Sequence, residues 1–312
     1  MLKGLFFLDS HRLDLISVCL VTYQTRDYLK GCLESIFAYP PRHPIEIILV
    51  DNGSTDGTVE LVHELFPQVK VIQNAANRGY TAAMNQALQD AKGQFLVQLN
   101  PDTIVYENAL DTLAKFLEDH PQVGICGPKV LNPDGSLQRS CRRGESTPLA
   151  VFAHFSGLDR LFPNHPKLAQ YWMNYRGEDE IHEVAGVSGS CMMIRRAVVN
   201  QIGYLDERFF AYQEDADFCF RARQAGWKIM YVPSARILHY GGVGGSHVEP
   251  YRSIIEWHRS YWNYYRKNLA HNYPTWFNAL YYLLMGVKLG SSLALQALNL
   301  GRFAKRNLKA KQ

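Results

Sequence analysis

The sequence has few cysteines and no Cys-x-x-Cys pair. Its six cysteines are scattered over 312 residues, at Cys19, Cys32, Cys126, Cys141, Cys191 and Cys219. A zinc knuckle needs closely spaced ligand pairs, and a disulfide framework needs a short chain dense in cysteine. Neither pattern is present, so we expect reduced thiols, which are typical of a cytoplasmic protein.

An excess of charge of one sign is also missing. The chain has 33 Lys and Arg against 29 Asp and Glu, so its composition does not favour nucleic acid as a partner. Internal repeats and low-complexity segments are absent from the sequence. With 47% hydrophobic and 20% charged residues, the composition is typical of a globular enzyme with one large domain and an appendage.

No long hydrophobic run opens the chain. The first residues, MLKGLFFLDSHR, contain an apolar run that Asp9 and His11 end, too short for a signal-peptide core or a membrane span. We therefore treat residues 1–14 as an N-terminal extension and expect the catalytic part of the chain in the cytoplasm.

The sequence does contain a regular alternation of strand-like and helix-like segments. Apolar runs at 15–23, 45–51, 69–74 and 93–100 are separated by helix-like stretches. This alternation predicts a mostly parallel sheet with helices on both faces and ligands at the carboxyl ends of the strands. VTYQTRDY, not Gly-x-Gly-x-x-Gly, follows the first strand, which argues against a dinucleotide enzyme.

The alternation stops after an Asn-Pro-Asp-Gly turn at 132–135. Residues 140–180 are irregular and rich in proline and aromatic residues, so we expect an insertion that either closes over the site or forms a plain surface loop. Order returns with a helix at 214–225 and two strands at 228–233 and 235–242.

Polar residues follow the second strand. Asp51 and Asn52 stand at its end in VDNGSTDGT, and Gly53 and Ser54 lead into a helix. A carboxylate at a strand tip can accept hydrogen bonds from a nucleobase, and a Gly-Ser turn lets backbone amides approach a phosphate. The alternative is a simple turn with a helix cap at Asp56.

A second polar group, NRGYTAAMNQAL (77–88), begins the next helix. Arg78 could contact a diphosphate, and Gly79 and the small residues after it would let this helix, which carries Asn85, lie close to a ligand. A tightly packed helix without a ligand is the alternative.

The segment LNPDT follows the fourth strand. Alternate residues of an extended segment point the same way, so Asn100 and Asp102 share one side. A hard divalent cation binds one or two protein carboxylates and completes its shell with substrate phosphates, which makes Asp102 a candidate metal ligand and Asn100 its neutral companion. Otherwise Asp102 is a helix cap. His239, in LHYGG, is a candidate further ligand, although a lone histidine is more often structural.

Three acids crowd the first turn of the helix in YQEDADFCFRARQAGW (212–227). Acids are favourable there because of the helix dipole, but Glu214, Asp215 and Asp217 are more than a cap requires. Like charges packed together raise one another's proton affinity, which suits a general base.

Taken in order, seven segments resemble the family 2 glycosyltransferases of the GT-A fold, near the rhamnosyltransferase-like and galactofuranosyltransferase-like branch. The segments are VTY, VDNGSTDGT, NRGYTAAMNQAL, LNPDT, GVSGSCMMIRR, YQEDADFCFRARQAGW and ILHYGG, and they cover about residues 15–245. The resemblance implies a GT-A nucleotide-diphospho-sugar transferase fold at 15–249 and a helical tail at 250–312.

The resemblance also implies a nucleotide-diphosphate sugar donor, a divalent metal (Mn or Mg) and a carboxylate base. Asp51 resembles the nucleobase-binding aspartate, and Asp215 resembles the base. Asp102 and His239 resemble metal ligands, whereas Asn100 departs from the aspartate that the family commonly has. The residues expected to bind the nucleotide sugar are Thr22, Tyr23, Asp51, Asn52, Ser54, Arg78, Gly79, Asn85 and Asn100.

The function that the resemblance implies is that of an inverting glycosyltransferase. We expect it to move rhamnose from dTDP-rhamnose to a hydroxyl of a cell-surface polysaccharide or lipid-linked glycan. The alternatives are a non-catalytic sugar-nucleotide or glycan-binding protein, and a nucleotidyltransferase on a similar sheet.

The tail has aromatic residues at helical spacing, a pattern that usually indicates core packing. WFNALYYLLMGV (276–287) is strongly apolar and is interrupted by Lys288. These features favour an amphipathic helix on the anionic inner face of the cell membrane over a spanning helix or a packed one. The basic residues expected at the membrane are Arg302, Lys305, Arg306, Lys309 and Lys311.

Overall fold

A computed structural model describes residues 14–309, apart from the side chains at 246 and 299–309. The predicted extension up to residue 13 therefore lies outside the described residues. The same holds for Lys311 and for the side chains of the other basic residues expected at the membrane, Arg302, Lys305, Arg306 and Lys309.

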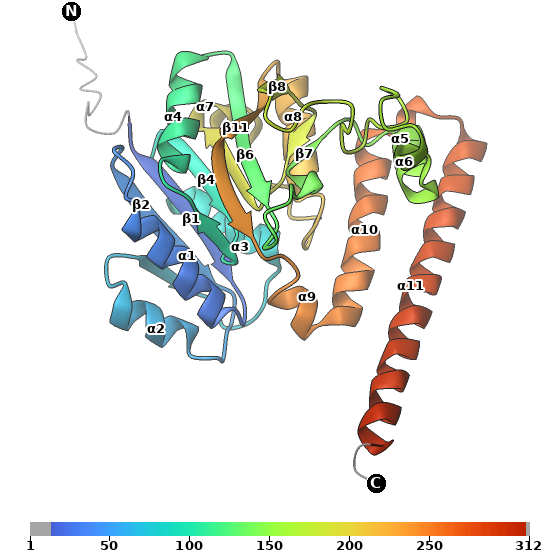
Figure 1. The fold of residues 1–312 in the computed structure, drawn as a ribbon, viewed down its shortest axis with the longest axis horizontal. Helices are drawn as coiled ribbons and strands as arrows, with labels where there is room; N and C mark the ends of the chain where they lie inside the picture. The colour runs from blue at the N-terminus through green and yellow to red at the C-terminus, as the bar shows by residue number, and fades with distance from the viewer. Residues whose placement is uncertain (1–13, 310–312) are drawn as a thin grey trace, which may run out of the picture.

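Strands and helices alternate through the N-terminal half (Figure 1). The elements there are β1 (Ile16–Thr22), α1 (Arg26–Ala38), β2 (Ile45–Asp51), α2 (Thr58–Leu65), β3 (Lys70–Gln73), α3 (Tyr80–Asp90), β4 (Phe95–Leu99), β5 (Thr103–Val105) and α4 (Ala109–Asp119). The later elements are β6 (Val123–Leu131), β7 (Arg142–Arg143), α5 (Pro148–Ser156), α6 (Leu158–Leu161), β8 (His182–Glu183), β9 (Gly186–Val187), β10 (Cys191–Arg195), α7 (Arg196–Ile202), α8 (Glu214–Gln224), β11 (Lys228–His239), α9 (Gly245–Val248), α10 (Pro250–Asn268) and α11 (Thr275–Lys309).

One large sheet runs in the order β3-β2-β1-β4-β10-β6-β11-β5, with β8 also paired to β11. The first four strands in this order pair in parallel, as do β6 and β11. β10, β5 and β8 run antiparallel to their neighbours. β1 is buried along its whole length, which explains its mostly apolar sequence. The predicted α/β class with a mostly parallel sheet is confirmed.

The segments predicted as two strands at 228–233 and 235–242 form one strand, β11. Pro233 has no N–H to give to a neighbouring strand, and the pairing of β11 with β6 shifts register between Val232 and Arg236. The sequence showed the interruption, but the strand continues through an irregularity rather than ending. The strand brings His239 to the same edge as the end of β4.

The predicted insertion contains the short helices α5 and α6, which lie beside α10 and α11 in Figure 1. α10 buries an aromatic face that contains Tyr261, Tyr264 and Tyr265, as the spacing predicted. Tyr264 packs on Phe220 of α8, and the Tyr261 hydroxyl meets that of Tyr171 in the insertion. α11 returns along α10, with Tyr281 stacked on Tyr265 at 3.8 Å between ring centroids.

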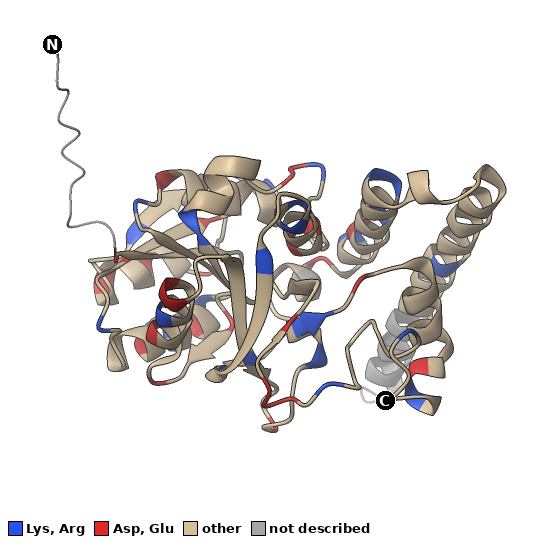
Figure 2. Cartoon of the chain, turned by 90° about the horizontal axis from the view of Figure 1, so that it is seen from above, with Lys and Arg blue, Asp and Glu red and all other residues tan. Residues whose placement is uncertain are grey.

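α11 differs from the rest of the chain in its charge. Figure 2 shows residues of both signs over the α/β unit, whereas Lys288 is the single charged residue between 275 and 300. Within residues 14–309, no helix combines the length and the hydropathy that crossing a membrane requires.

Candidate active site

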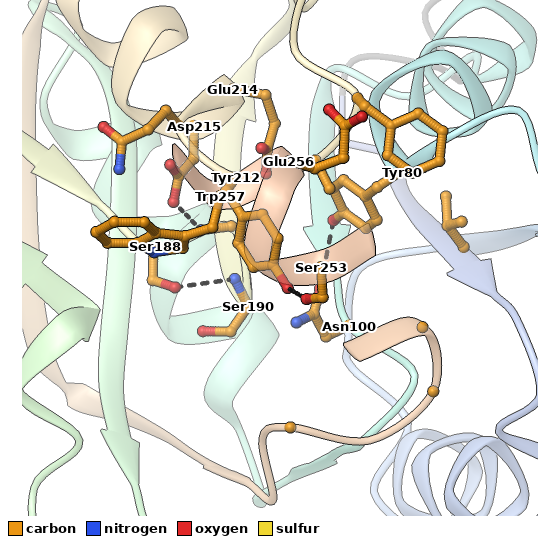
Figure 3. A pocket seen from close by; sticks show the side chains of 18 of the residues that line it. Tyr80, Asn100, Ser188, Ser190, Tyr212, Glu214, Asp215, Ser253, Glu256 and Trp257 are labelled. Atoms are coloured by element: carbon orange, nitrogen blue, oxygen red, sulfur yellow. Dashed lines mark hydrogen bonds between the residues drawn. The ribbon is translucent and has the colours of Figure 1, made fainter. Parts of the chain in front are cut away.

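A cavity of about 470 Å³ opens where β1, β2 and β4 end and β11 meets them. Parallel strands present their carboxyl ends at one edge, and ligands bind there in open α/β sheets. Asn100 and Asp102 come from the end of β4, and Glu214 and Asp215 come from α8. Figure 3 shows Glu214 and Asp215 on one side of the cavity and Asn100 on the other. Candidate residues far apart in the sequence thus share one site.

His239 is held in a defined orientation. Its Nδ1 lies 2.7 Å from Gln138 Oε1, and Gln138 Nε2 donates to Asn132 Oδ1 at 3.1 Å. The glutamine oxygen must therefore accept, which places a hydrogen on Nδ1. His239 Nε2 is left facing Asp102 Oδ1 at 3.2 Å and Asn100 Nδ2 at 3.2 Å.

Asp102, Asn100 and His239 could hold a cation with help from a ligand. A bare imidazole nitrogen and a carboxylate oxygen at this distance repel each other unless a proton or a cation lies between them. Among the described residues, no group of three or more His, Cys, Asp or Glu could hold a metal ion. The donor set present is therefore incomplete, and the phosphate oxygens of a substrate would have to complete it.

Asp215 is fixed in place by its hydrogen bonds. Its Oδ2 accepts from Gly189 N at 2.9 Å and from the guanidinium of Arg143, and its Oδ1 accepts from Ala216 N at 2.7 Å. Arg143 lies on β7, 72 residues away, so no local pattern could have identified it. Asp215 Oδ1 accepts one hydrogen bond and therefore retains a second lone pair that can face the cavity.

Asp217 is fully buried and turned away from the cavity. It accepts hydrogen bonds from Arg221 Nε at 2.9 Å, Lys267 Nζ at 2.8 Å and Asn268 Nδ2 at 2.9 Å. The acid is thus the anchor that ties α8 to α10.

Glu214 lines the cavity, and its Oε2 has no hydrogen-bond partner within the described part of the chain. Burial, reinforced by the charge of Asp215, raises the pKa of Glu214 from 4.5 to about 8. Burial therefore favours the protonated form of Glu214.

Replacing Glu214 with Gln is expected to stabilise the protein increasingly as the pH rises. Between pH 4.5 and about 8, folded Glu214 keeps a proton that the unfolded chain releases, so its contribution to stability is complete below 4.5 and is lost toward 8. Glutamine cannot ionise. The melting temperatures of both proteins, measured from pH 5 to 8.5, test this expectation. A difference in melting temperature that does not change with pH would contradict it.

The expected nucleotide end is organised by side chains that bond to backbone. Asp51 is buried and accepts from Gly53 N at 3.3 Å and Ser54 N at 3.1 Å. Asn52 lines the cavity and donates to Asn77 Oδ1 at 3.0 Å and to the carbonyl of Gly79 at 3.1 Å. These bonds fix the two loops against each other.

Tyr23 and Gly79 shape the same end. Tyr23 lines the cavity, and its hydroxyl donates to Glu249 at 3.0 Å, while the Thr22 hydroxyl is buried against that of Thr25 at 2.8 Å. Gly79 has a φ of +90°, and a Cβ there would lie 2.6 Å from the ring of Phe210. Only glycine fits this position, where Phe210 reaches the cavity wall.

Six of the residues expected to bind the nucleotide sugar do not line the cavity: Thr22, Asp51, Ser54, Arg78, Gly79 and Asn85. Arg78 is exposed, and the Ser54 hydroxyl accepts a hydrogen bond from Gln24 N at 3.0 Å. The Asn85 side chain donates a hydrogen bond to the carbonyl of Leu205 at 2.9 Å. We therefore leave Asn85 out of the proposed binding set.

The cavity also has an aromatic wall that the motifs did not indicate. It comes from the insertion and from α10, and its rings are Tyr171, Trp172, Trp257 and Tyr261. The only signal in the sequence was the density of aromatic residues in these two segments. Their approach to α8 depends on packing between distant elements.

Comparison with known proteins agrees with this geometry. The model of "Glycosyl transferase family 2" matches residues 17–203. An N-acetylglucosaminyl-diphospho-decaprenol L-rhamnosyltransferase of Mycobacterium tuberculosis is 34% identical over 238 residues, which cover 73% of this chain and 76% of the relative. A low-salt glycan biosynthesis hexosyltransferase of Haloferax volcanii is 27% identical over 68% of this chain and 62% of its own length.

Solved structures share the fold. The crystal structure of GalNAc-T7 with UDP, GalNAc and Mn²⁺ matches with a TM-score of 0.54 at 20% identity, over 75% of this chain and 46% of that one. The structure of S. aureus TarS matches with a TM-score of 0.52 at 20% identity, over 77% of this chain and 38% of that one. The GT-A fold is confirmed, and the chain belongs to glycosyl transferase family 2.

Proposed function

We propose that this glycosyltransferase moves rhamnose from dTDP-rhamnose, with inversion, to a hydroxyl of a lipid-linked glycan. The observation that carries the proposal is the single cavity with Asp102, Asn100 and His239 at one side and Glu214 and Asp215 at the other. The first group suits a diphosphate, and the second suits an acceptor hydroxyl. The rhamnosyltransferase relative supports the choice of sugar and of a lipid-linked acceptor.

In the proposed reaction Asp215 takes the proton of the acceptor hydroxyl. The hydroxyl oxygen bonds to the anomeric carbon as the bond from that carbon to the diphosphate breaks, so the configuration inverts. Asp102 and His239 would hold Mn²⁺ or Mg²⁺, which supplies positive charge to the leaving diphosphate when bound. Asn52, Tyr23 and the turn at Asp51 would hold the nucleotide.

Transfer itself tests the proposal. The purified protein is incubated with dTDP-rhamnose, Mn²⁺ or Mg²⁺, and N-acetylglucosaminyl diphosphate on a short isoprenoid, and the product is identified by mass spectrometry. We expect the mass of one added deoxyhexose. Transfer from UDP-galactose or UDP-N-acetylglucosamine, but not from dTDP-rhamnose, would show that the proposed donor is wrong. Binding of a nucleotide sugar without any turnover would favour a sugar-nucleotide-binding protein.

We also propose that α11 attaches the protein to the inner face of the cell membrane. Apolar residues recur at helical spacing along its outer face and are exposed to solvent. They are Trp276, Leu280, Leu283, Leu284, Val287, Leu295 and Leu298.

Replacing Leu283 and Leu284 with Glu should reduce sedimentation with phosphatidylglycerol vesicles about tenfold or more, because each leucine loses a burial worth about 1.5–3 kcal/mol. Leu65→Glu, an exposed leucine of α2, is the matched control and should sediment like the wild type. Equal sedimentation of all three proteins would refute attachment through α11.

A further inference from the structure

The aromatic wall lies beside the proposed base. The guanidinium of Arg143, which bonds Asp215, also interacts electrostatically with Tyr171 and Tyr261. The two tyrosine hydroxyls meet at 2.6 Å, and the ring of Trp257 lies 4.0 Å from that of Tyr261. Flat rings next to a base can carry the apolar face of a sugar, so this wall is suited to the acceptor.

A cation lies directly outside this wall. Lys288 of α11 holds its ammonium 3.8 Å from the centre of the Trp257 ring and 4.6 Å from that of Phe155. No carboxylate of the described chain forms an ion pair with it. Partial burial lowers the pKa of Lys288. An ammonium that has lost part of its water and forms no ion pair within the described residues can still gain strongly from an anion.

Beyond Lys288 the surface becomes apolar. Phe152 and Phe155 of α5 are 60% and 51% exposed, and Leu284 and Val287, within one turn of Lys288, are 57% and 63% exposed. Large apolar side chains from two separate segments therefore surround the lysine on the outer side. A patch of this kind commonly marks an interaction surface.

We propose that Lys288 binds the diphosphate of a lipid-linked sugar acceptor, with the sugar on the Trp257 wall and the isoprenoid on the apolar surface of α5 and α11. The order from the cavity outward is carboxylate, aromatic rings, cation and apolar surface. A sugar, a diphosphate and an isoprenoid follow one another in the same order. This inference rests on the proposed function, because it requires an acceptor that carries a diphosphate.

Lys288→Met tests the charge while keeping most of the side-chain volume. With N-acetylglucosaminyl diphosphate on a short isoprenoid, in neutral detergent, we expect the variant to raise the acceptor KM roughly tenfold or more, the scale of a lost charge-assisted contact. With an octyl N-acetylglucosaminide, which has no diphosphate, the KM should stay unchanged. Lys288→Arg should keep the KM for the diphosphate acceptor near the wild-type value.

Lys92→Met, at an exposed position, is the control and should leave both KM values unchanged. If Lys288→Met raised the KM of both acceptors equally, the lysine would only hold α11 against α10, and the inference would fail. Unchanged KM values for both acceptors would overturn it as well. A wild-type protein that transfers to neither acceptor would instead overturn the proposed function.

Discussion

Asp215→Asn is expected to lower the rate of sugar transfer by about a hundredfold or more, the usual scale for removal of a general base. The amide keeps the shape, and its single oxygen can keep one of the two backbone hydrogen bonds, either that from Gly189 or that from Ala216. It cannot take the proton of the acceptor hydroxyl. Binding of dTDP-rhamnose should stay within about twofold of the wild type, because the base contributes to the chemical step rather than to donor binding.

Glu214→Gln is the matched control for this experiment. Glu214 is adjacent and lines the same cavity, but burial raises its pKa and so favours the protonated form, which cannot accept the proton of the acceptor. We expect a much smaller loss of rate. Near-normal transfer by Asp215→Asn together with an inactive Glu214→Gln would assign the base to Glu214. The rates are measured in single turnover, with calorimetry for the donor.

Asp102→Ala should weaken metal-dependent binding of the donor on the order of a hundredfold. The variant loses the carboxylate ligand and leaves His239 as the remaining strong protein ligand of the metal. Asp102→Asn should behave similarly. In the wild type, the N–H of Gly241 donates to Asp102 Oδ2 at 2.9 Å. The Asn variant keeps an oxygen that can accept this hydrogen bond, so comparing the two variants separates the loss of charge from the loss of this contact. Calorimetry with dTDP-rhamnose, with Mn²⁺ and then with EDTA, measures the effect.

Asn100→Asp is the opposite control, since it adds the carboxylate that the metal motif commonly has. It should tighten the metal-dependent part of donor binding. If the metal affected wild-type, Asp102→Ala and Asp102→Asn proteins equally, Asp102 would be only the acceptor that holds the loop at Gly241.

The sequence predicted the elements and the edge of the sheet that carries the site. Strand ends are local features: an apolar run followed by LNPDT or VDNGS places Asp102 and Asp51 at carboxyl ends whatever the rest of the chain does. The parallel order then brings these ends together. Helix α8 was equally predictable, because its acids and its periodicity lie within one short segment.

Contacts between segments that are distant in the sequence could not be predicted from local patterns. Gln138 orients His239 across 101 residues, and Arg143 reaches Asp215 across 72. Both partners lie in or near a segment that has no periodicity. Arg78 shows the reverse case, in which the residue type suits a diphosphate but the side chain is exposed. The direction of a loop side chain depends on packing that sequence patterns do not specify.

The bonds between Asp217 and α10 also limit how this enzyme can evolve. The matched family segment ends at residue 203, yet the carboxylate on α8 has its Lys267 and Asn268 partners far beyond that point. A recombination that exchanged the chain after residue 249 would leave a buried charge without them, at a cost of roughly 3–5 kcal/mol. α10 must therefore be inherited together with the catalytic unit.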